Sequence, residues 1–138
     1  FDAVTYLAMR KVKPKNFFNL VIGKVRQDIL KWPNRVKYDP TIFSNDTCKE
    51  NDNAFPTILP NWDHTPRSGR YGLVLTESTP EAFETCCKIA KDKVIDKPYD
   101  KRFIFLKSWN EWAEGNYMEP DRKYGHAYLK ALKRVFLD

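Results

Sequence analysis

Apolar residues along the chain follow two different spacings. Short blocks of mostly apolar residues are typical of strands, and segments in which apolar residues return every three or four positions are typical of amphipathic helices. The predicted strands lie at 3–7, 57–60, 72–76 and 103–106, and the predicted helices at 16–32, 78–94 and 124–136. Because the two kinds of segment alternate, the pattern predicts an α/β fold with a parallel sheet and helices packed outside it.

Three segments add detail to this pattern. Ser78 and Glu81 form a capping box around Pro80, which predicts the start of a helix. The consecutive apolar residues at 103–106 are typical of a strand that is buried on both faces. The stretch at 39–55 is mostly polar, and we predict a surface loop there.

The composition suits one globular domain or a part of one. Of the 138 residues, 42% are hydrophobic and 14% aromatic, and the formal net charge is +6. This charge favours acidic partners without choosing among phosphates, nucleic acids and anionic lipids. The apolar runs reach at most five residues, whereas a membrane helix needs about 20. We therefore expect no membrane span.

The cysteines indicate the cellular compartment of the protein, and the first residues indicate whether the sequence is a whole chain or a part of one. The chain has 3 cysteines, and Cys86 and Cys87 are adjacent on the apolar stripe of a predicted helix. Such spacing suits neither a disulfide framework nor a zinc site, so we expect reduced thiols and a cytoplasmic protein. The sequence begins at Phe1 and runs straight into an apolar segment. We expect residues 1–138 to form a single partial domain of a longer chain.

Several well-known chemical motifs do not occur in the sequence. There is no G-x-G-x-x-G, Walker loop, C-x-x-C, H-E-x-x-H or G-x-S-x-G, so we expect no dinucleotide or other cofactor. His64 and His126 lie far apart in the sequence, and we predict no metal site. Four acidic residues could together hold a cation, namely Glu111, Glu114, Glu119 and Asp121. The simpler interpretation is that the neighbouring Arg122 and Lys123 offset the repulsion between these carboxylates.

The segment at 108–121 is the densest in candidate chemistry. It directly follows an apolar strand, and the loops at the carboxyl ends of parallel strands are where α/β folds build their sites. Glu111 and Glu114 are three positions apart, so in a helical turn their carboxylates project on one side. The candidate site residues of this segment are Trp109, Asn110, Glu111, Trp112, Glu114, Tyr117 and Glu119.

These residue types match the needs of glycosyl transfer. Paired carboxylates can move protons at the departing oxygen and act beside the anomeric carbon. Indole and phenol rings offer flat faces for a sugar ring, and Asn110 offers an amide donor. The alternative is a solvated surface turn, because two glutamates three apart are usually just exposed. The density of aromatic, amide and acidic groups after one strand favours the site.

A second candidate loop follows the predicted strand at 57–60. Asp63 could accept hydrogen bonds from sugar hydroxyls, and Arg67 could fork onto a carboxylate or phosphate, with Trp62 as a flat apolar surface. In the alternative interpretation this loop is only structural. Asp63 then caps a turn, Arg67 pairs with the Asp63 carboxylate, and Trp62 packs on the core.

Two motifs carry a resemblance to a known family. The motif S-W-N-E-W-A-E-G-N-Y-M-E-P-D at 108–121 and the motif P-T-I-L-P-N-W-D-H-T-P-R at 56–67 resemble the WbsX-type family of glycosyltransferases. That family is associated with bacterial surface polysaccharide (O-antigen, lipopolysaccharide) biosynthesis. It is similar to glycoside hydrolase family 99, the endo-α-mannosidases, whose fold is a (β/α)8 barrel. The resemblance implies that this chain is the C-terminal portion of such a TIM-like barrel.

The resemblance also implies roles and partners. By it, Glu111 is the base that engages the sugar 2-hydroxyl, and Glu114 is the general acid/base at the glycosidic oxygen. The substrate is a sugar or glycan, with an activated sugar donor if the reaction is a transfer. The acidic metal motif of many nucleotide-sugar enzymes does not occur here, so transfer and hydrolysis both stay open.

A competing hypothesis comes from a different functional class. The +6 net charge also fits a non-catalytic module that binds polyanions or glycans, although we expect no nucleic acid partner.

A closed barrel needs about 250 residues and eight strands, about twice what this chain provides. We therefore expect the chain alone to be inactive. We also expect self-association through its open face, rearranged packing that covers the open sheet with helices, or marginal stability.

Overall fold

The computed structural model describes residues 4–6, 17–41 and 54–138, which form a mixed α/β structure. In chain order the elements are β1 (Val4–Tyr6), α1 (Phe17–Asp28), β2 (Asn34–Lys37), β3 (Ala54–Ile58), α3 (Thr65–Ser68), η2 (Gly69–Tyr71), β4 (Leu73–Thr76), α4 (Pro80–Val94), η3 (Tyr99–Lys101), β5 (Phe105–Leu106), β6 (Asn110–Glu111), η4 (Trp112–Glu114), β7 (Asn116–Tyr117) and α5 (Ala127–Phe136). Helices and strands alternate along most of the chain, as the sequence pattern predicts.

The strands pair mainly in parallel. β3 lies between β1 and β5, with Thr57 aligned with Phe105, and β2 pairs in parallel with β4. The exception is the short antiparallel pair of β6 and β7, which carries the loop with the candidate carboxylates. The predicted parallel α/β arrangement is confirmed for these strand pairs.

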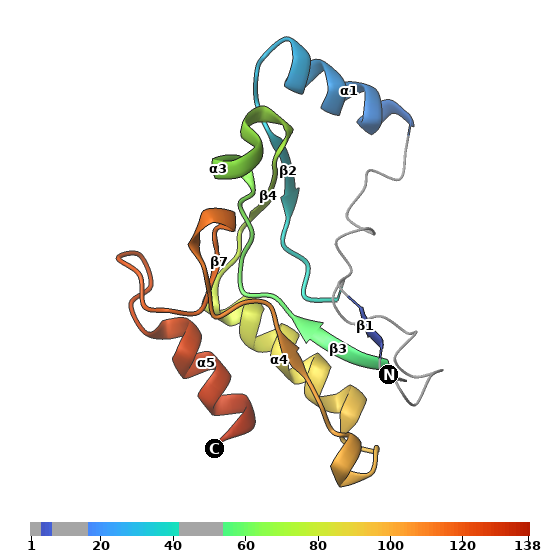
Figure 1. The fold of residues 1–138 in the computed structure, drawn as a ribbon, viewed down its shortest axis with the longest axis vertical. Helices are drawn as coiled ribbons and strands as arrows, with labels where there is room; N and C mark the ends of the chain where they lie inside the picture. The colour runs from blue at the N-terminus through green and yellow to red at the C-terminus, as the bar shows by residue number, and fades with distance from the viewer. Residues whose placement is uncertain (1–3, 7–16, 42–53) are drawn as a thin grey trace.

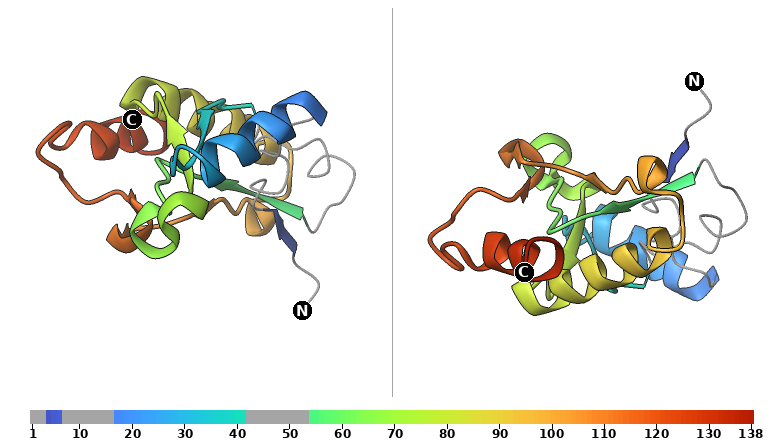
Figure 2. Two further views of the ribbon diagram at one scale, coloured as in Figure 1. Left: turned by 90° about the horizontal axis from the view of Figure 1, so that it is seen from above. Right: turned by 90° about the horizontal axis from the view of Figure 1, so that it is seen from below.

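The core forms where β3 meets α4 and α5. Every residue of β3 is buried, and α4 turns Phe83, Cys86 and Cys87 toward it. α5 lies beside α4 and adds Tyr128 to the same apolar cluster (Figures 1 and 2). The predicted burial of the two cysteines is thus confirmed, and both are free thiols.

The start of α4 differs slightly from the expected capping box. The hydroxyl of Thr79, not of Ser78, caps the helix by accepting a 3.2 Å hydrogen bond from the amide of Ala82. Pro80 then occupies the first helical turn, where a backbone N–H has no hydrogen-bond acceptor within the helix, so the absence of this group in proline costs nothing. The helix therefore begins within the predicted segment, one residue later than the box implied.

Three parts of the predicted secondary structure need correction: one strand was missed, one begins earlier than predicted, and one is shorter and more exposed than predicted. β2 was not predicted, because its four residues show no apolar run and are held in place by parallel pairing with β4. β3 begins at Ala54, so the last residues of the predicted loop 39–55 are buried strand, while 42–53 lie outside the described residues. The run at 103–106 is not a strand buried on both faces, because only Phe105–Leu106 pairs and Phe105 is 44% exposed.

α1 stands apart from this core. It lies at the opposite end of the molecule from α5 (Figure 1). Several apolar side chains of α1 and of the residues just after it are exposed, with Phe18 at 73% and Ile29 at 71%. Among the described residues, none of the helices combines the length and the apolar character that crossing a membrane would require.

Candidate active site

Hydrogen bonds join the two loops that carry the candidate residues. The amide of Asp63 donates to the carbonyl oxygen of Glu114 at 2.8 Å. The Asn116 side-chain amide donates to the carbonyl oxygen of Asn61 at 2.7 Å, and the Tyr117 amide donates to the Asn61 side chain at 3.1 Å. Asn116 is fully buried, so its bond to Asn61 is partly shielded from water, and the three bonds together fix the loops against each other.

Gly115 makes this close approach possible. Its φ of +51° is a left-handed conformation that side chains disfavour. A Cβ atom at this position would lie 2.8 Å from the Cβ of Asp63. The glycine therefore satisfies both the turn after η4 and the contact between the two loops.

Glu111 and Glu114 converge on one guanidinium group. Nη2 of Arg67 donates to Oε1 of Glu111 at 2.9 Å, and Nη1 donates to Oε1 of Glu114 at 3.2 Å. Glu111 immediately precedes the short 3₁₀ turn η4 and Glu114 is the last residue of that turn, so the two do not lie in an α-helical turn. Their three-residue spacing still places both carboxylates on the same side, and the Arg67 charge offsets their mutual repulsion.

Glu114 is the more enclosed of the two glutamates. Its side chain is 13% exposed, against 37% for Glu111. Nε2 of His64 lies 3.6 Å from Oε1 of Glu114, and Nζ of Lys107 lies 3.8 Å from Oε2. Lys107 also lies over the ring of Trp62, 5.1 Å from its centroid. Cationic and aromatic side chains therefore surround Glu114.

The aromatic residues of the second motif form an ordered stack. The rings of Trp112 and Tyr117 are parallel within 13°, with centroids 3.7 Å apart. The indole N–H of Trp112 donates to Glu119 at 2.6 Å, and the Tyr117 hydroxyl donates to Asp121 at 3.1 Å. Burial and the Asp121 carboxylate raise the pKa of the Tyr117 phenol above its ordinary value. The phenol therefore stays protonated as a donor at neutral pH.

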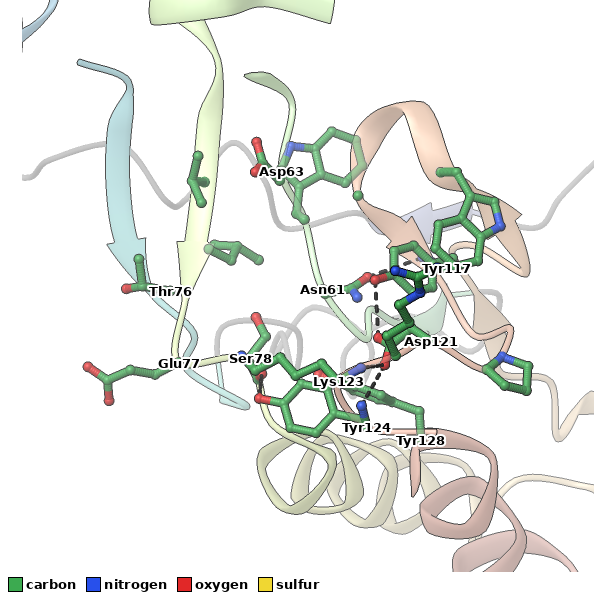
Figure 3. A pocket seen from close by; sticks show the side chains of 17 residues that line it. Asn61, Asp63, Thr76, Glu77, Ser78, Tyr117, Asp121, Lys123, Tyr124 and Tyr128 are labelled. Atoms are coloured by element: carbon green, nitrogen blue, oxygen red, sulfur yellow. Dashed lines mark hydrogen bonds between the residues drawn. The ribbon is translucent and has the colours of Figure 1, made fainter. Parts of the chain in front are cut away.

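A cavity of about 880 Å³ lies beside these loops (Figure 3). Its lining comes from three segments, 61–63, 74–78 and 112–124, together with Tyr128. In Figure 3 the side chains of Asn61, Tyr117 and Asp121 point toward one another. The lining includes Gly115 but neither Glu111 nor Glu114, so the carboxylate pair lies next to the cavity rather than in its wall.

The structure groups most, but not all, of the predicted site residues. Trp62, Asp63, Trp112 and Tyr117 line the cavity, and Arg67 joins the two glutamates. Three others lie outside the lining: Trp109 and Asn110 are exposed at β6, and Glu119 binds the indole N–H of Trp112.

The structural alternative for the second loop is correct for Asp63 and wrong for Arg67. The structural alternative paired Arg67 with Asp63, but Arg67 binds the glutamates instead. Asp63 does cap a turn, because its Oδ1 accepts hydrogen bonds from the amide and hydroxyl of Thr65 at 2.9 and 2.6 Å. This turn starts α3, which presents Arg67 to the carboxylates.

Several residues at the site were not predicted from the sequence. Each of them lies within or next to a predicted motif, but its role depends on tertiary contacts that the local sequence pattern does not predict. These residues are Asn61, His64, Lys107 and Asn116. Within the described ranges, no three His, Cys, Asp or Glu side chains converge to form a metal-binding group.

Comparison with solved structures identifies a similar fold. A protein described as a glycoside hydrolase-like protein superimposes with a TM-score of 0.56 over 98% of this chain and 37% of its own, at 22% sequence identity. At this identity the likeness concerns the fold. It agrees with the parallel α/β arrangement described above.

Comparison with protein sequences identifies the family. Two proteins of Xanthomonas campestris pv. campestris, from strains B100 and ATCC 33913, are both named uncharacterized protein WxcX and are 31% identical over 82 residues. The match covers 59% of this chain but 12% of either relative. Residues 3–132, nearly the whole chain, match the family described as glycosyltransferase WbsX. The chain therefore belongs to the WbsX glycosyltransferase family, a family of carbohydrate-active proteins.

Proposed function

We propose that the complete protein makes or breaks glycosidic bonds and that Glu111 and Glu114 are its acid/base pair. The observation that carries this proposal is their common contact with Arg67, at 2.9 and 3.2 Å, where two loops are locked together. Two carboxylates held at one point can act on the same bond, one on a proton and the other beside the anomeric carbon. A solvated surface turn would not need this arrangement.

The two glutamates have different roles in this proposal. Glu111, the more exposed, is the base that engages the sugar 2-hydroxyl, and Glu114 is the general acid/base at the glycosidic oxygen. Both use Oε1 to bind Arg67. Among the residues that the structure describes, Oε2 of Glu111 has no hydrogen-bond or ion-pair partner, whereas Oε2 of Glu114 forms an ion pair with Nζ of Lys107 at 3.8 Å. A substrate would therefore meet Oε2 of Glu111 directly and would share Oε2 of Glu114 with Lys107.

The proposed substrate is a sugar or glycan bound across the neighbouring cavity. Trp62, Trp112 and Tyr117 provide apolar ring surfaces there, and Asp63 provides a carboxylate at the junction of the loops. Glu119 fixes the indole of Trp112. Aromatic rings combined with a few fixed polar groups are the usual composition of a small-molecule site. Trp109 and Asn110, both exposed, would extend the binding surface outward.

The wider setting belongs to the same proposal. We place the chain in the C-terminal portion of a (β/α)8 barrel that acts in bacterial surface polysaccharide biosynthesis in the cytoplasm. Parallel strands with the site at their loop ends support the barrel, and membership of the WbsX family supports the polysaccharide setting. Both transfer to an acceptor and hydrolysis by water fit the carboxylate pair.

A binding experiment separates this proposal from a basic module without chemistry. The complete gene product is titrated with a series of mannose-containing oligosaccharides and with heparin, each at low and high salt. We expect saturable glycan binding that changes little with salt and is altered by Glu111→Gln. Tight heparin binding that falls steeply with salt, with no glycan binding and no effect of Glu111→Gln, would contradict the proposal.

A further inference from the structure

One side of α1 carries a stripe of apolar side chains that stays exposed. Its members recur every three or four residues, so they fall within about 100° of the helix circumference. Their exposed fractions run from 39% to 73%. We call this set the apolar stripe of α1; its members are Phe18, Val21, Ile22, Val25 and Ile29, the last of which continues the helix through a 2.9 Å bond from its amide to the carbonyl oxygen of Val25.

α1 contacts the rest of the protein through its other side. A Cβ atom at Gly23 would lie 3.2 Å from Oδ1 of Asn34 in β2, so the two segments approach closely there. Gly23 and Gln27 are the least exposed residues of α1 among those whose exposure the structure describes. Both lie on the side of the helix away from the apolar stripe. A helix at the surface of a globular domain normally packs in the reverse orientation, so the stripe is available to a partner.

Basic residues surround the apolar stripe. At about 100° per residue, Arg26 borders the stripe on one side and Lys24 lies beyond its other edge. Asp28 is the single acidic residue between positions 17 and 35. The basic residues of this segment are all exposed, and within the described ranges none of them forms an ion pair; they are Lys24, Arg26, Lys31 and Arg35.

The net charge of the whole chain comes from this end of the sequence. Residues 1–35 carry eight Lys and Arg and two Asp, which equals the entire net charge of +6. Residues 36–138, which include the candidate site, carry as many acidic as basic side chains. An anionic surface should therefore attract the segment that contains α1 rather than the rest of the molecule.

From these observations we infer that α1 binds the surface of a membrane that contains anionic phospholipids. The apolar stripe enters the boundary between headgroups and acyl chains, and the basic residues lie at the lipid phosphates. Trp32, which follows the stripe and is 59% exposed, fits this placement because indole rings favour the interface. With 12 residues, α1 is too short to cross a hydrocarbon core of about 30 Å, so it lies in the plane of the surface.

An anionic membrane uses both features of α1, whereas other partners would use one. A soluble polyanion would pair with the basic residues but leave the apolar stripe in water. An uncharged apolar groove of a protein would cover the stripe but leave the basic residues without partners. The inference goes beyond the proposed function and does not depend on the roles of Glu111 and Glu114.

Flotation of the complete gene product with lipid vesicles tests the inference. The probes are vesicles of phosphatidylcholine alone and vesicles of phosphatidylcholine mixed with phosphatidylglycerol. We expect at least about tenfold tighter binding to the anionic vesicles, and this preference should shrink as salt is raised. Lys24→Gln and Arg26→Gln should each weaken binding about fivefold. Ile29→Gln should weaken it at least about threefold, because it removes apolar area from the stripe.

Two variants on α5 serve as matched controls. Lys130→Gln removes an exposed cation, and Leu137→Gln removes an apolar side chain that is 79% exposed. Both should bind vesicles like the wild-type protein. A second measurement reports the depth of α1 directly. Brominated phospholipids should quench the tryptophan emission of the wild-type protein more than that of Trp32→Phe.

Four results would overturn the inference. If the complete gene product does not bind anionic vesicles, another part of the protein or a second copy covers the stripe. If it binds both kinds of vesicle equally, the basic residues do not select the lipid. Anionic binding that is unchanged in Ile29→Gln would identify a polyanion site that uses charge alone. Equal losses in the α1 variants and the α5 controls would show that α1 is not the contact.

Discussion

The backbone amide of Asp63 donates a hydrogen bond to the carbonyl oxygen of Glu114 at 2.8 Å. These residues are far apart in the sequence, yet the bond places the turn that carries Arg67 directly against the turn that carries both glutamates. The geometry of the carboxylates therefore depends on how closely the two backbones approach each other. Gly115 is the residue that permits this approach.

Gly115→Ala should destabilise the protein and reduce its activity. The left-handed φ of +51° and a Cβ placed 2.8 Å from that of Asp63 together should cost about 2–4 kcal/mol in the free energy of unfolding. Gly125→Ala is a matched control, since its φ is +53° but nothing lies within 4 Å of the added Cβ. The control should cost only about 1 kcal/mol. Equal losses for the two variants in urea unfolding would show that the contact with Asp63 is unimportant.

Arg67→Lys should reduce turnover with little effect on stability. Lysine keeps the charge but cannot fork onto two carboxylates, so the glutamates should lose their common orientation. Misplaced catalytic groups can cost about 100-fold in rate. The Arg67 side chain is 50% exposed, so the change in unfolding free energy should stay below about 1 kcal/mol.

Arg35→Lys provides the control for this variant, because Arg35 is an exposed residue of β2 away from the site. It should behave like the wild-type protein in both turnover and unfolding. If Arg67→Lys also retains wild-type turnover, Arg67 does not position the glutamates.

Cys86 and Cys87 should be unreactive in the folded protein. Both are buried, and burial raises the pKa of each thiol, so little reactive thiolate forms at neutral pH. A Cys48→Ser background, which removes the third cysteine, should label slowly with a thiol reagent until the protein is unfolded. Rapid labelling at pH 7 in the native state would contradict the burial of these thiols.

The raised thiol pKa values also predict how stability depends on pH. The unfolded thiols ionise near pH 8.5, whereas the folded thiols ionise at higher pH. Their contribution is therefore present below about pH 8.5 and is lost as pH rises above it. Replacing both cysteines with Ala should flatten this part of the stability curve.

The 138-residue chain expressed alone should self-associate. Phe18, Ile29 and Trp32 at and beyond α1 are 73%, 71% and 59% exposed, and the apolar residues of β5 are also partly exposed. Light scattering should detect oligomers whose fraction falls in Ile29→Gln. Leu137→Gln is a suitable control, because Leu137 is 79% exposed at the far end of α5. A compact monomer of the unmodified chain would show that α1 does not drive association.

The main elements could be predicted because their patterns are local. The apolar stripe of α4 and the Pro80 signal describe one helix and its start, and the buried cysteines follow from the same stripe. β2 could not be predicted in this way, because its pairing partner β4 lies more than thirty residues away. The exposure of Phe103 and Phe105 likewise depends on what packs against β5, which an apolar run does not reveal.

In the candidate site, too, residues in one local segment could be predicted, whereas contacts between distant segments could not. Glu111, Glu114 and the aromatic residues could be identified from their density in one segment. The partner of Arg67 could not, because Thr65 satisfies the nearby Asp63 and leaves Arg67 to reach residues more than forty positions away. The cavity residues after Asp121 and around Ser78 were also missed. They come from two segments that only the packing of α4 against α5 brings together.

The turnover of Glu114→Gln in the complete gene product is the most direct test of the proposed carboxylate pair. The substitution removes a proton donor and acceptor but keeps the shape of the side chain. It should lower turnover by about 10²–10⁴-fold, while glycan affinity stays within about tenfold of that of the wild-type protein. Wild-type turnover in Glu114→Gln would contradict the account.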